Sequence, residues 1–232
     1  MVLAALAVAG PFIYIHFFNS TPSALSLTPG STSSAPAPSS GSTASSGGTA
    51  TANTAASGAV AGTWTAGSGS VVGYRVNEVL LGQNATAVGR TSSVTGHLTI
   101  SGTTATAASF SVPMATVHSD KSQRDDQFDN RIMNVSQYPT GTFTLTSPID
   151  LAPVPASGVI KSYTAHGKLT LHGTTRAVTF TLTAERKGNE IEVAGDIPVL
   201  FSDYNIQNPS FAGFVTTPDH GLLEFLLVFS RS

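Results

Sequence analysis

The sequence predicts an all-β protein, a single antiparallel barrel or sandwich built from residues 62–232. Apolar and polar residues alternate with period two in run after run, as at Val72, Tyr74 and Val76. This is the pattern of strands that turn one face to an apolar interior. Turn sequences such as ISGTTAT, LHGTTRA and RKGNE separate the runs at hairpin spacing. With only one helical pattern and no strand–helix–strand alternation, eight or more short strands indicate one barrel or sandwich.

The first eighteen residues, MVLAALAVAGPFIYIHFF, form an apolar run broken only by Gly10, Pro11 and His16. As a helix, the run would extend about 27 Å, close to the roughly 30 Å of a hydrocarbon core. We expect residues 1–18 to be an uncleaved transmembrane anchor. The alternative is a signal peptide cut after Ala9, but that cut would leave GPFIYIHFF as an exposed apolar end.

The next segment, residues 19–61, consists almost wholly of Ser, Thr, Ala, Gly and Pro. It has too little apolar bulk to offset the entropy of ordering the chain, so we expect a disordered linker. Roughly 40 flexible residues span on the order of 35 Å, enough to hold a domain off a membrane surface. Hydroxyl-rich stalks are typical outside the cytoplasm. The expectation is a single-pass protein of the cell membrane with an extracytoplasmic folded domain.

Charge is scarce and unevenly placed in this chain. All 24 charged residues (11 Lys and Arg, 13 Asp and Glu) follow Tyr74, and the net charge is −2. A balance so close to neutral gives no basis for a nucleic-acid partner. The lack of cysteine excludes a disulfide scaffold. The oligomeric state stays open, a homodimer included.

Much of the charge falls in SDKSQRDDQFDNRIMN, residues 119–134, the one convincing helix of the folded part. Ser119 or Asp120 is placed to cap it. Asp120 and Arg124 are spaced as an i,i+4 ion pair. The charges at Arg124 and Asp125 are either a solvated surface or the soluble outer side of a helix that closes a ligand entrance.

The same helix has a small apolar underside. Phe128 and Ile132 are four residues apart and share one face, with Met133 beside them. An apolar underside has to rest on an apolar partner, and the mouth of a barrel is the natural one. We therefore expect Phe128 to point inward.

Three segments of the folded part resemble the YceI family. RDDQFDNRIMNVSQYPTGTF resembles the family's helix signature, GHLTISGTTATAASFSVPMATVHSD its hairpin leading into that helix, and GKLTLHGTTRAVTFTL its strand pair. The segments stand in the family's order, and the resemblance extends over about residues 60–232. Two departures stand out: Gln127 replaces a His of many relatives, and SDYNIQNPSFAGFVTTPDHGLLEFLL replaces a more polar ending.

The resemblance implies an eight-stranded, lipocalin-like barrel with one short helix, holding a long isoprenoid chain such as a quinone tail. Eight strands enclose just enough room for side chains or one slender ligand. Burial at about 0.8 kcal/mol per methylene gives on the order of 10 kcal/mol for a few isoprene units. Micromolar binding needs about 8 kcal/mol. Small inward residues are expected to leave the room, unless they relieve the curvature around a packed core. These are Gly73, Gly96, Ala165, Gly167 and Gly195.

The candidate ligand-binding residues come from the inward strand positions, the underside of the helix and the segment NPSFAGF, residues 208–214. They are Tyr74, Val76, Leu98, Phe110, Val112, Met114, Phe128, Ile132, Met133, Phe143, Leu169, Phe180, Phe201, Phe211 and Phe225. The segment 208–214 is expected either to pack on the end of the barrel or to form an apolar lip where a lipid enters.

No catalytic or metal-binding motif stands in a suitable context. His166 and His172 are interpreted as surface strand residues, and Asp125, Asp126 and Asp129 as helix surface. We expect a lipid-binding protein that is not an enzyme, needs no cofactor, and carries, stores or protects an isoprenoid lipid or quinone. The arginines are too dispersed for a phosphate site, which favours a neutral headgroup. The alternatives are a structural or stress-related cell-envelope module with a packed core, and an enzyme acting on such a lipid.

Overall fold

The structure is a computed structural model, and it describes residues 21–27, 60–211 and 213–232. The expected anchor at 1–18 and most of the expected linker lie outside these ranges. Among the helices that the described ranges contain, none combines the length and the hydropathy needed to cross a membrane.

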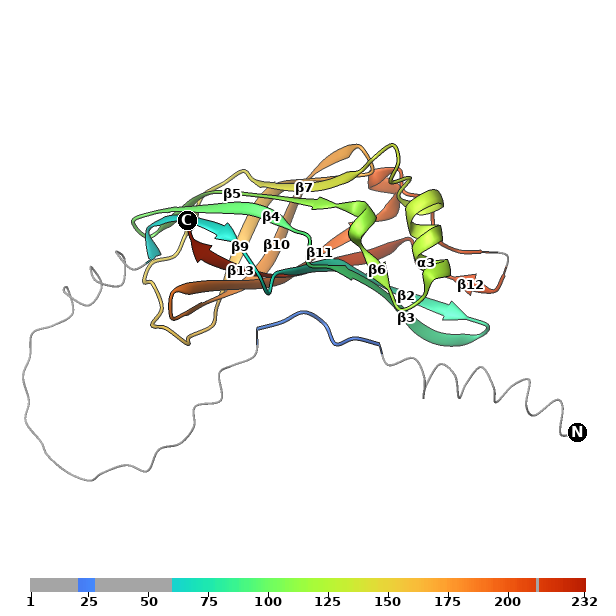
Figure 1. Cartoon of the computed structure of the whole chain (residues 1–232), viewed down its shortest axis with the longest axis horizontal. Helices are drawn as coiled ribbons and strands as arrows, with labels where there is room; N and C mark the ends of the chain where they lie inside the picture. Colours follow the sequence, from blue (N-terminus) through green and yellow to red (C-terminus); the bar gives the residue numbers. More distant parts are fainter. Residues whose placement is uncertain (1–20, 28–59, 212) are drawn as a thin grey trace, which may run out of the picture.

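The described chain forms one antiparallel sheet that closes into a barrel (Figure 1). Its strands are β1 (Gly62–Ala66), β2 (Val71–Leu80), β3 (Gln83–Thr91), β4 (Thr95–Ser101), β5 (Thr104–Pro113), β6 (His118–Ser119), β7 (Thr140–Leu145), β8 (Ile149–Asp150), β9 (Lys161–Leu171), β10 (Thr174–Lys187), β11 (Glu190–Leu200), β12 (Val215–Thr216) and β13 (His220–Arg231). Eight strands form the ring, in the order β1, β4, β5, β7, β9, β10, β11 and β13, and pairing of β1 with β13 closes it. The predicted eight-stranded antiparallel barrel is confirmed.

A hairpin of β2 and β3 extends the barrel wall at one end. The free edge of β13 pairs with β1 at Phe229–Arg231 and with β2 at Leu222–Leu226. The hairpin turns at Leu81 and Gly82, whose φ angles are 50° and 79°. Two positive φ angles in a two-residue turn match the right-handed twist of the flanking strands. The turn therefore projects past the barrel at the end where α3 also lies (Figure 1).

The predicted helix is shorter than expected and changes its hydrogen-bond pattern. It consists of α3 (Ser122–Gln127) and a π-helical segment, η2 (Phe128–Ile132). The N-cap is Lys121 and makes no capping bond with its side chain, so the predicted cap at residue 119 or 120 is wrong. Ser119 instead donates its N–H and its hydroxyl to the Asp125 carboxylate, at 2.8 and 2.7 Å. Two short 3₁₀ turns are η1 (Met114–Thr116) and η3 (Phe201–Tyr204).

Residues 21–27 lie in extended form against the outer wall of the barrel, although they belong to the segment expected to be a disordered linker. We call them the strap; Figure 1 shows it in blue. Arg75 of β2 donates to the carbonyl oxygen of Pro22 at 2.8 Å, and Arg90 of β3 donates to that of Ser23. Leu27, the last residue of the strap, is buried.

The two arginines that hold the strap also bind a buried carboxylate. Glu224 of β13 points outward, is 3% exposed, and lies 3.0 Å from Arg75 and 2.6 Å from Arg90. A buried carboxylate is stable when charged donors satisfy its oxygens. The ion pair therefore fixes both guanidinium groups in the positions from which they bind the strap.

Candidate functional site

One cavity of about 770 Å³ follows the barrel lumen. Gln127 and Phe211 line it at the helix end, and Ile149 and Val159 line it at the opposite end. Along β13 the lining extends from Gly221 to Phe229, eight steps of about 3.3 Å, or roughly 26 Å. The volume falls within the range of about 300–1,000 Å³ that is usual for ligand sites. The lumen is thus long and narrow.

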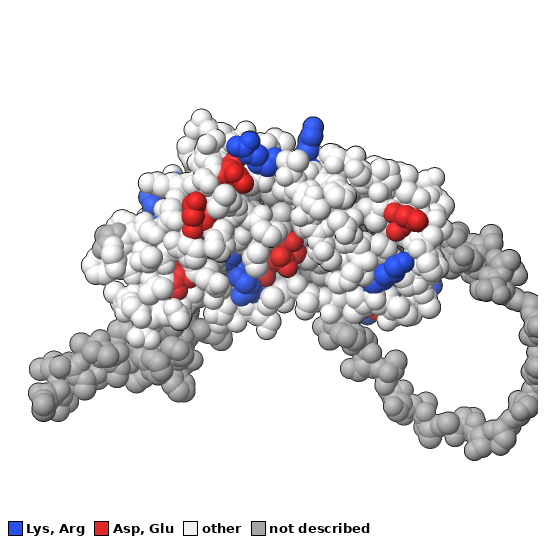
Figure 2. Space-filling view, turned by 180° about the vertical axis from the view of Figure 1, so that it is seen from behind, with Lys and Arg blue, Asp and Glu red and all other residues white. Residues whose placement is uncertain are grey.

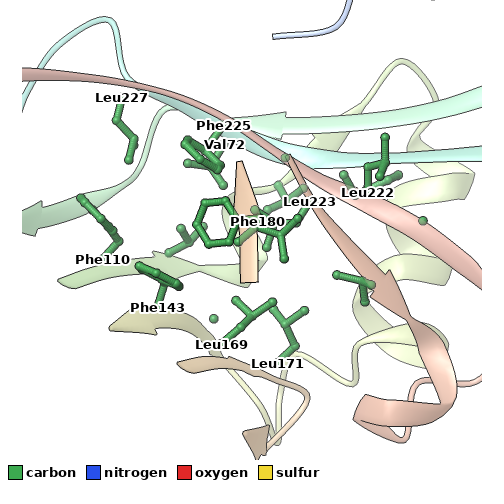
Figure 3. Close-up of a pocket in the computed structure, with 18 of the residues that line it drawn as sticks. Val72, Phe110, Phe143, Leu169, Leu171, Phe180, Leu222, Leu223, Phe225 and Leu227 are labelled. Carbon is green, nitrogen blue, oxygen red and sulfur yellow. The ribbon is translucent and has the colours of Figure 1, made fainter. Parts of the chain in front are cut away.

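The wall of this cavity is almost entirely carbon. Figure 3 shows Phe110, Phe143, Phe180 and Phe225 around a common space, with leucines of β9 and β13 among them. Several inward side chains pack against the core and yet stay partly exposed, among them Leu182, Val193 and Leu223. Because these side chains point into the barrel, the surface they expose faces the lumen. The centre of the barrel is hollow.

All fifteen candidate residues named from the sequence line this cavity. Period two alone places the strand members, since alternate residues of a strand point to the same face. The polar lining of the mouth was missed, as was the segment 149–159 that lines the opposite end. That segment has no strand periodicity that would have marked it. Contact of the fifteen with a ligand stays a prediction.

The structure corrects the role expected for the inward glycines. A Cβ on Gly96 would lie 2.3 Å from the Phe110 ring, and one on Gly167 would lie 2.3 Å from the Phe143 ring. These glycines are covered by aromatic rings rather than facing open space. Covering a strand glycine with a ring from a neighbouring strand stabilises a sheet. The room in the lumen therefore arises because the glycines let the rings lie back on the wall.

Gly195 of the expected set is also covered, since a Cβ on it would lie 2.9 Å from the Phe225 ring. Gly73 was expected to face inward, and this is wrong: it pairs with Glu224 and Arg90, whose side chains lie on the outer wall. A Cβ on Gly73 would lie 2.1 Å from the carbonyl oxygen of Gly89 and 2.9 Å from the Arg90 side chain. Ala165 is buried and does line the cavity.

The underside of the helix covers one mouth of the lumen. Phe128 of η2 stacks on Tyr74 of β2, with ring centroids 5.2 Å apart and planes 17° apart. Phe128 and Met133 are buried, and both line the cavity. Burial raises the pKa of Tyr74 to about 12, although the nearby Arg124 opposes this shift. The phenol is therefore neutral at physiological pH.

The polar groups of the mouth gather on the helix and its neighbours. Arg124 pairs with Asp120, as predicted, and also with Glu78 of β2 at 3.3 Å. The two carboxylates offset the charge of this guanidinium. The pairing with Glu78 could not be read from the sequence because the two residues are 46 positions apart.

Arg131 joins the helix to the loop that carries Phe211. Its Nε donates to the Gln127 side chain at 2.8 Å, and its Nη2 donates to the carbonyl oxygen of Pro209 at 3.0 Å. Its guanidinium lies 6.0 Å from the centre of the Phe211 ring. These contacts leave Gln127, Arg131 and Phe211 together at the entrance, where they line the cavity.

The remaining titratable residues form no metal site in the described ranges, where no cluster of three or more His, Cys, Asp or Glu could hold an ion. His172 is not a strand residue, as was expected, but sits in the β9–β10 turn with φ 48°. Its ring packs edge-on against Tyr138, with centroids 4.4 Å apart. Asp129 buries one carboxylate oxygen without a hydrogen-bond partner, and burial together with the charge of Asp125 raises its pKa.

Comparison with known proteins agrees with this architecture. A polyisoprenoid-binding domain from Saccharophagus degradans, implicated in plant cell wall breakdown, superposes with a TM-score of 0.61 at 16% identity, covering 74% of this chain and 99% of that one. Burkholderia cenocepacia BcnA gives 0.54 at 21% identity, covering 68% and 95%. A Campylobacter jejuni YCEI protein gives 0.51 at 13%, covering 62% and 84%. No curated protein sequence matches the chain.

At these identities the structural matches establish the fold alone. The family is established by the sequence, because residues 64–229 match the profile of the YceI-like domain. This match covers most of the chain, and it includes every strand that lines the lumen. The chain belongs to the YceI-like family.

Proposed function

We propose that this protein binds one long isoprenoid lipid, with the tail along the lumen and the headgroup at the mouth beneath α3. The observation that carries the proposal is the elongated, carbon-lined cavity. A hollow of this shape in a folded barrel exposes apolar surface to water unless an apolar chain fills it. The solved Saccharophagus domain, which shares the fold, is a polyisoprenoid-binding domain.

The mouth favours a neutral headgroup with hydrogen-bond acceptors, such as a quinone. Gln127 and Arg131 supply N–H donors there. The charge of Arg124 is already matched by Glu78 and Asp120. Arg131 keeps its charge, because its hydrogen bonds go to neutral acceptors, and one guanidinium beside the Gln127 amide suits a carbonyl oxygen, whereas a phosphate site calls for several converging cations.

The protein would hold its lipid for carriage, storage or protection rather than transform it. The lining is predominantly apolar, and Glu185 is the one buried carboxylate among its described residues, so the cavity is suited to holding a tail. We further propose that residues 1–18 anchor the chain in the cell membrane, with the barrel on the extracytoplasmic side. The support for this is the apolar composition of residues 1–18, which contain no Lys, Arg, Asp or Glu.

Mass spectrometry of lipid extracted from the purified full-length protein tests the proposal. We expect about one prenyl lipid per barrel, with its headgroup given by the fragment masses. A protein that carries no lipid and does not take up a prenyl quinone when one is offered would favour the structural module. Conversion of the added quinone to a new mass would favour the enzyme.

A further inference from the structure

Four large apolar side chains stand exposed together at the helix end of the barrel. They are Val79 and Leu81 of the β2–β3 hairpin, and Phe211 and Phe214 of the loop before β12, exposed by 38%, 53%, 57% and 58%. We call these four residues the tip. Only two other large apolar side chains of the described residues are similarly exposed, Val159 and Leu200.

The tip is one continuous structure. Val79 pairs with Thr216 across the β2–β12 ladder. Leu81 donates its N–H to the carbonyl oxygen of Phe214 at 2.9 Å. An apolar patch held in place by backbone hydrogen bonds marks an interaction surface better than scattered exposed residues do.

The tip is also continuous with the cavity. Phe211 of the tip and Leu80, which lies between two other tip residues in the sequence, line the entrance of the lumen. Seen from behind, the charged side chains of the molecule are few, and mostly white surface covers its end at the left of the view (Figure 2). A lipid that leaves the lumen at this mouth therefore meets an apolar surface next.

The strap fixes the place at which the N-terminal segment joins the barrel. Pro22 and Ser23 are bound by Arg75 and Arg90, and Thr21 borders a shallow depression that Val79 and Thr216 also line. The strap therefore runs antiparallel to β2, and its first residue lies beside the base of the tip. Thr21, the residue to which the N-terminal segment is joined, is therefore placed beside the base of the tip.

The chain before Thr21 identifies the partner as a lipid surface. The apolar run ends at Phe18, three residues before Thr21. Three residues span about 10 Å at most. A membrane that holds the run can therefore be no farther than this from the first residue of the strap, beside the tip.

We propose that the tip sits in the surface of the membrane and that the strap holds the barrel with its mouth facing that membrane. This inference rests on the proposed membrane anchor at residues 1–18, and it does not depend on which lipid fills the lumen. In this orientation an isoprenoid tail passes from the bilayer over Phe211 into the lumen without crossing water.

Two tryptophan variants of the full-length chain test the position of the tip. Phe214→Trp places the probe in the tip, and Val159→Trp places it in an exposed apolar position at the opposite end of the barrel. Both are reconstituted in phosphatidylcholine vesicles that contain no isoprenoid and carry bromine on the upper acyl chain. Trp64, the only native tryptophan, is buried and contributes the same background to both.

We expect bromine to quench roughly half or more of the emission added by Phe214→Trp, because interfacial side chains sink about 5–10 Å into the headgroup region. Val159→Trp should lose almost none. Equal quenching of the two, or quenching of neither, overturns the proposal. Quenching of neither together with a dimer in sedimentation would assign the tip to a second copy of the chain.

Replacing residues 21–27 by seven Gly and Ser residues in the Phe214→Trp chain tests the strap. The length of the chain and its carbonyl oxygens are unchanged, but the buried Leu27 side chain and the rigid Pro22 are lost, so a flexible segment no longer holds its carbonyl oxygens in place for Arg75 and Arg90. We expect quenching to fall by more than half, and undiminished quenching refutes the role of the strap. Lipid content is measured on the same samples, so a barrel that binds no isoprenoid but still shows quenching at the tip contradicts the proposed function alone.

Discussion

Narrowing the lumen should abolish lipid binding without unfolding the barrel. Leu182→Phe combined with Val193→Phe adds seven carbon atoms to two side chains that face the cavity and remain partly exposed to it. Each bulky ring occupies space that the structure leaves open, so the substitutions need not displace the wall. Filling such a space with apolar atoms stabilises the empty protein or leaves its stability unchanged.

The expected loss of affinity follows from the volume removed. Seven carbons of a tail excluded from the lumen forgo about 0.8 kcal/mol each, or roughly 5–6 kcal/mol. At about 1.4 kcal/mol per tenfold, this weakens binding by about four powers of ten. A tail that shifts along the lumen recovers part of this energy, so the figure is an upper estimate.

The assay is binding of a tritiated prenyl quinone, with thermal unfolding measured on the same samples. The matched control is Thr179→Phe combined with Thr181→Phe, which adds the same kind of rings to the exposed outer face of β10. The control should bind like the wild type. If the lumen variant unfolds normally and still binds with wild-type affinity, then the lipid does not lie in the lumen and the reasoning fails.

Three further predictions concern individual side chains. Gly167→Ala should lower the free energy of unfolding in urea by about 1–3 kcal/mol, because its Cβ would lie 2.3 Å from the Phe143 ring. Phe143→Leu should restore part of that loss, and no restoration would contradict the packing described. The folded-state pKa of Tyr74 is raised from 10.0 to about 12, so its contribution to stability is complete below pH 10 and is lost as the pH rises to 12. The stability of Tyr74→Phe should fall less over this window, whereas parallel curves would refute the assignment. The pKa of Asp129 is also raised, so the stability gained from its protonation is lost as the pH rises through the folded-state pKa. Asp129→Asn should raise the unfolding temperature at pH 7 and have little effect in acid, and an equal shift at both would count against this account.

Much of the fold and of the cavity lining could be predicted because a period of two reports directly which strand residues point inward. Phe110, Leu169 and Phe225 were placed in this way, and the structure brings them to one lumen. The helix was found from the spacing of Phe128 and Ile132. Its start was wrong by one or two residues because Asp125 binds Ser119 and leaves Lys121 as the N-cap.

The features that could not be predicted depend on contacts between distant parts of the chain. Only Leu25 and Leu27 distinguish Thr21–Leu27 from the rest of the Ser-rich segment, and two leucines do not predict its contacts with two arginines more than fifty positions away. The glycines were assigned an inward face, but their function depends on which ring of the next strand covers them. Likewise, the link between Arg131 and Pro209 follows from the three-dimensional arrangement and not from any local pattern.

The strap also changes what the length of the Ser- and Thr-rich segment can control. Residues 28–59 begin after Leu27 and end before Val60, and both of these residues are buried against the barrel. Because both ends of this segment are joined to residues of the same folded body, lengthening it costs little free energy. The length of residues 28–59 then does not affect the distance between the barrel and the proposed membrane anchor. Insertions, deletions or sugars in residues 28–59 would alter the bulk around the domain but would leave its distance from the membrane unchanged.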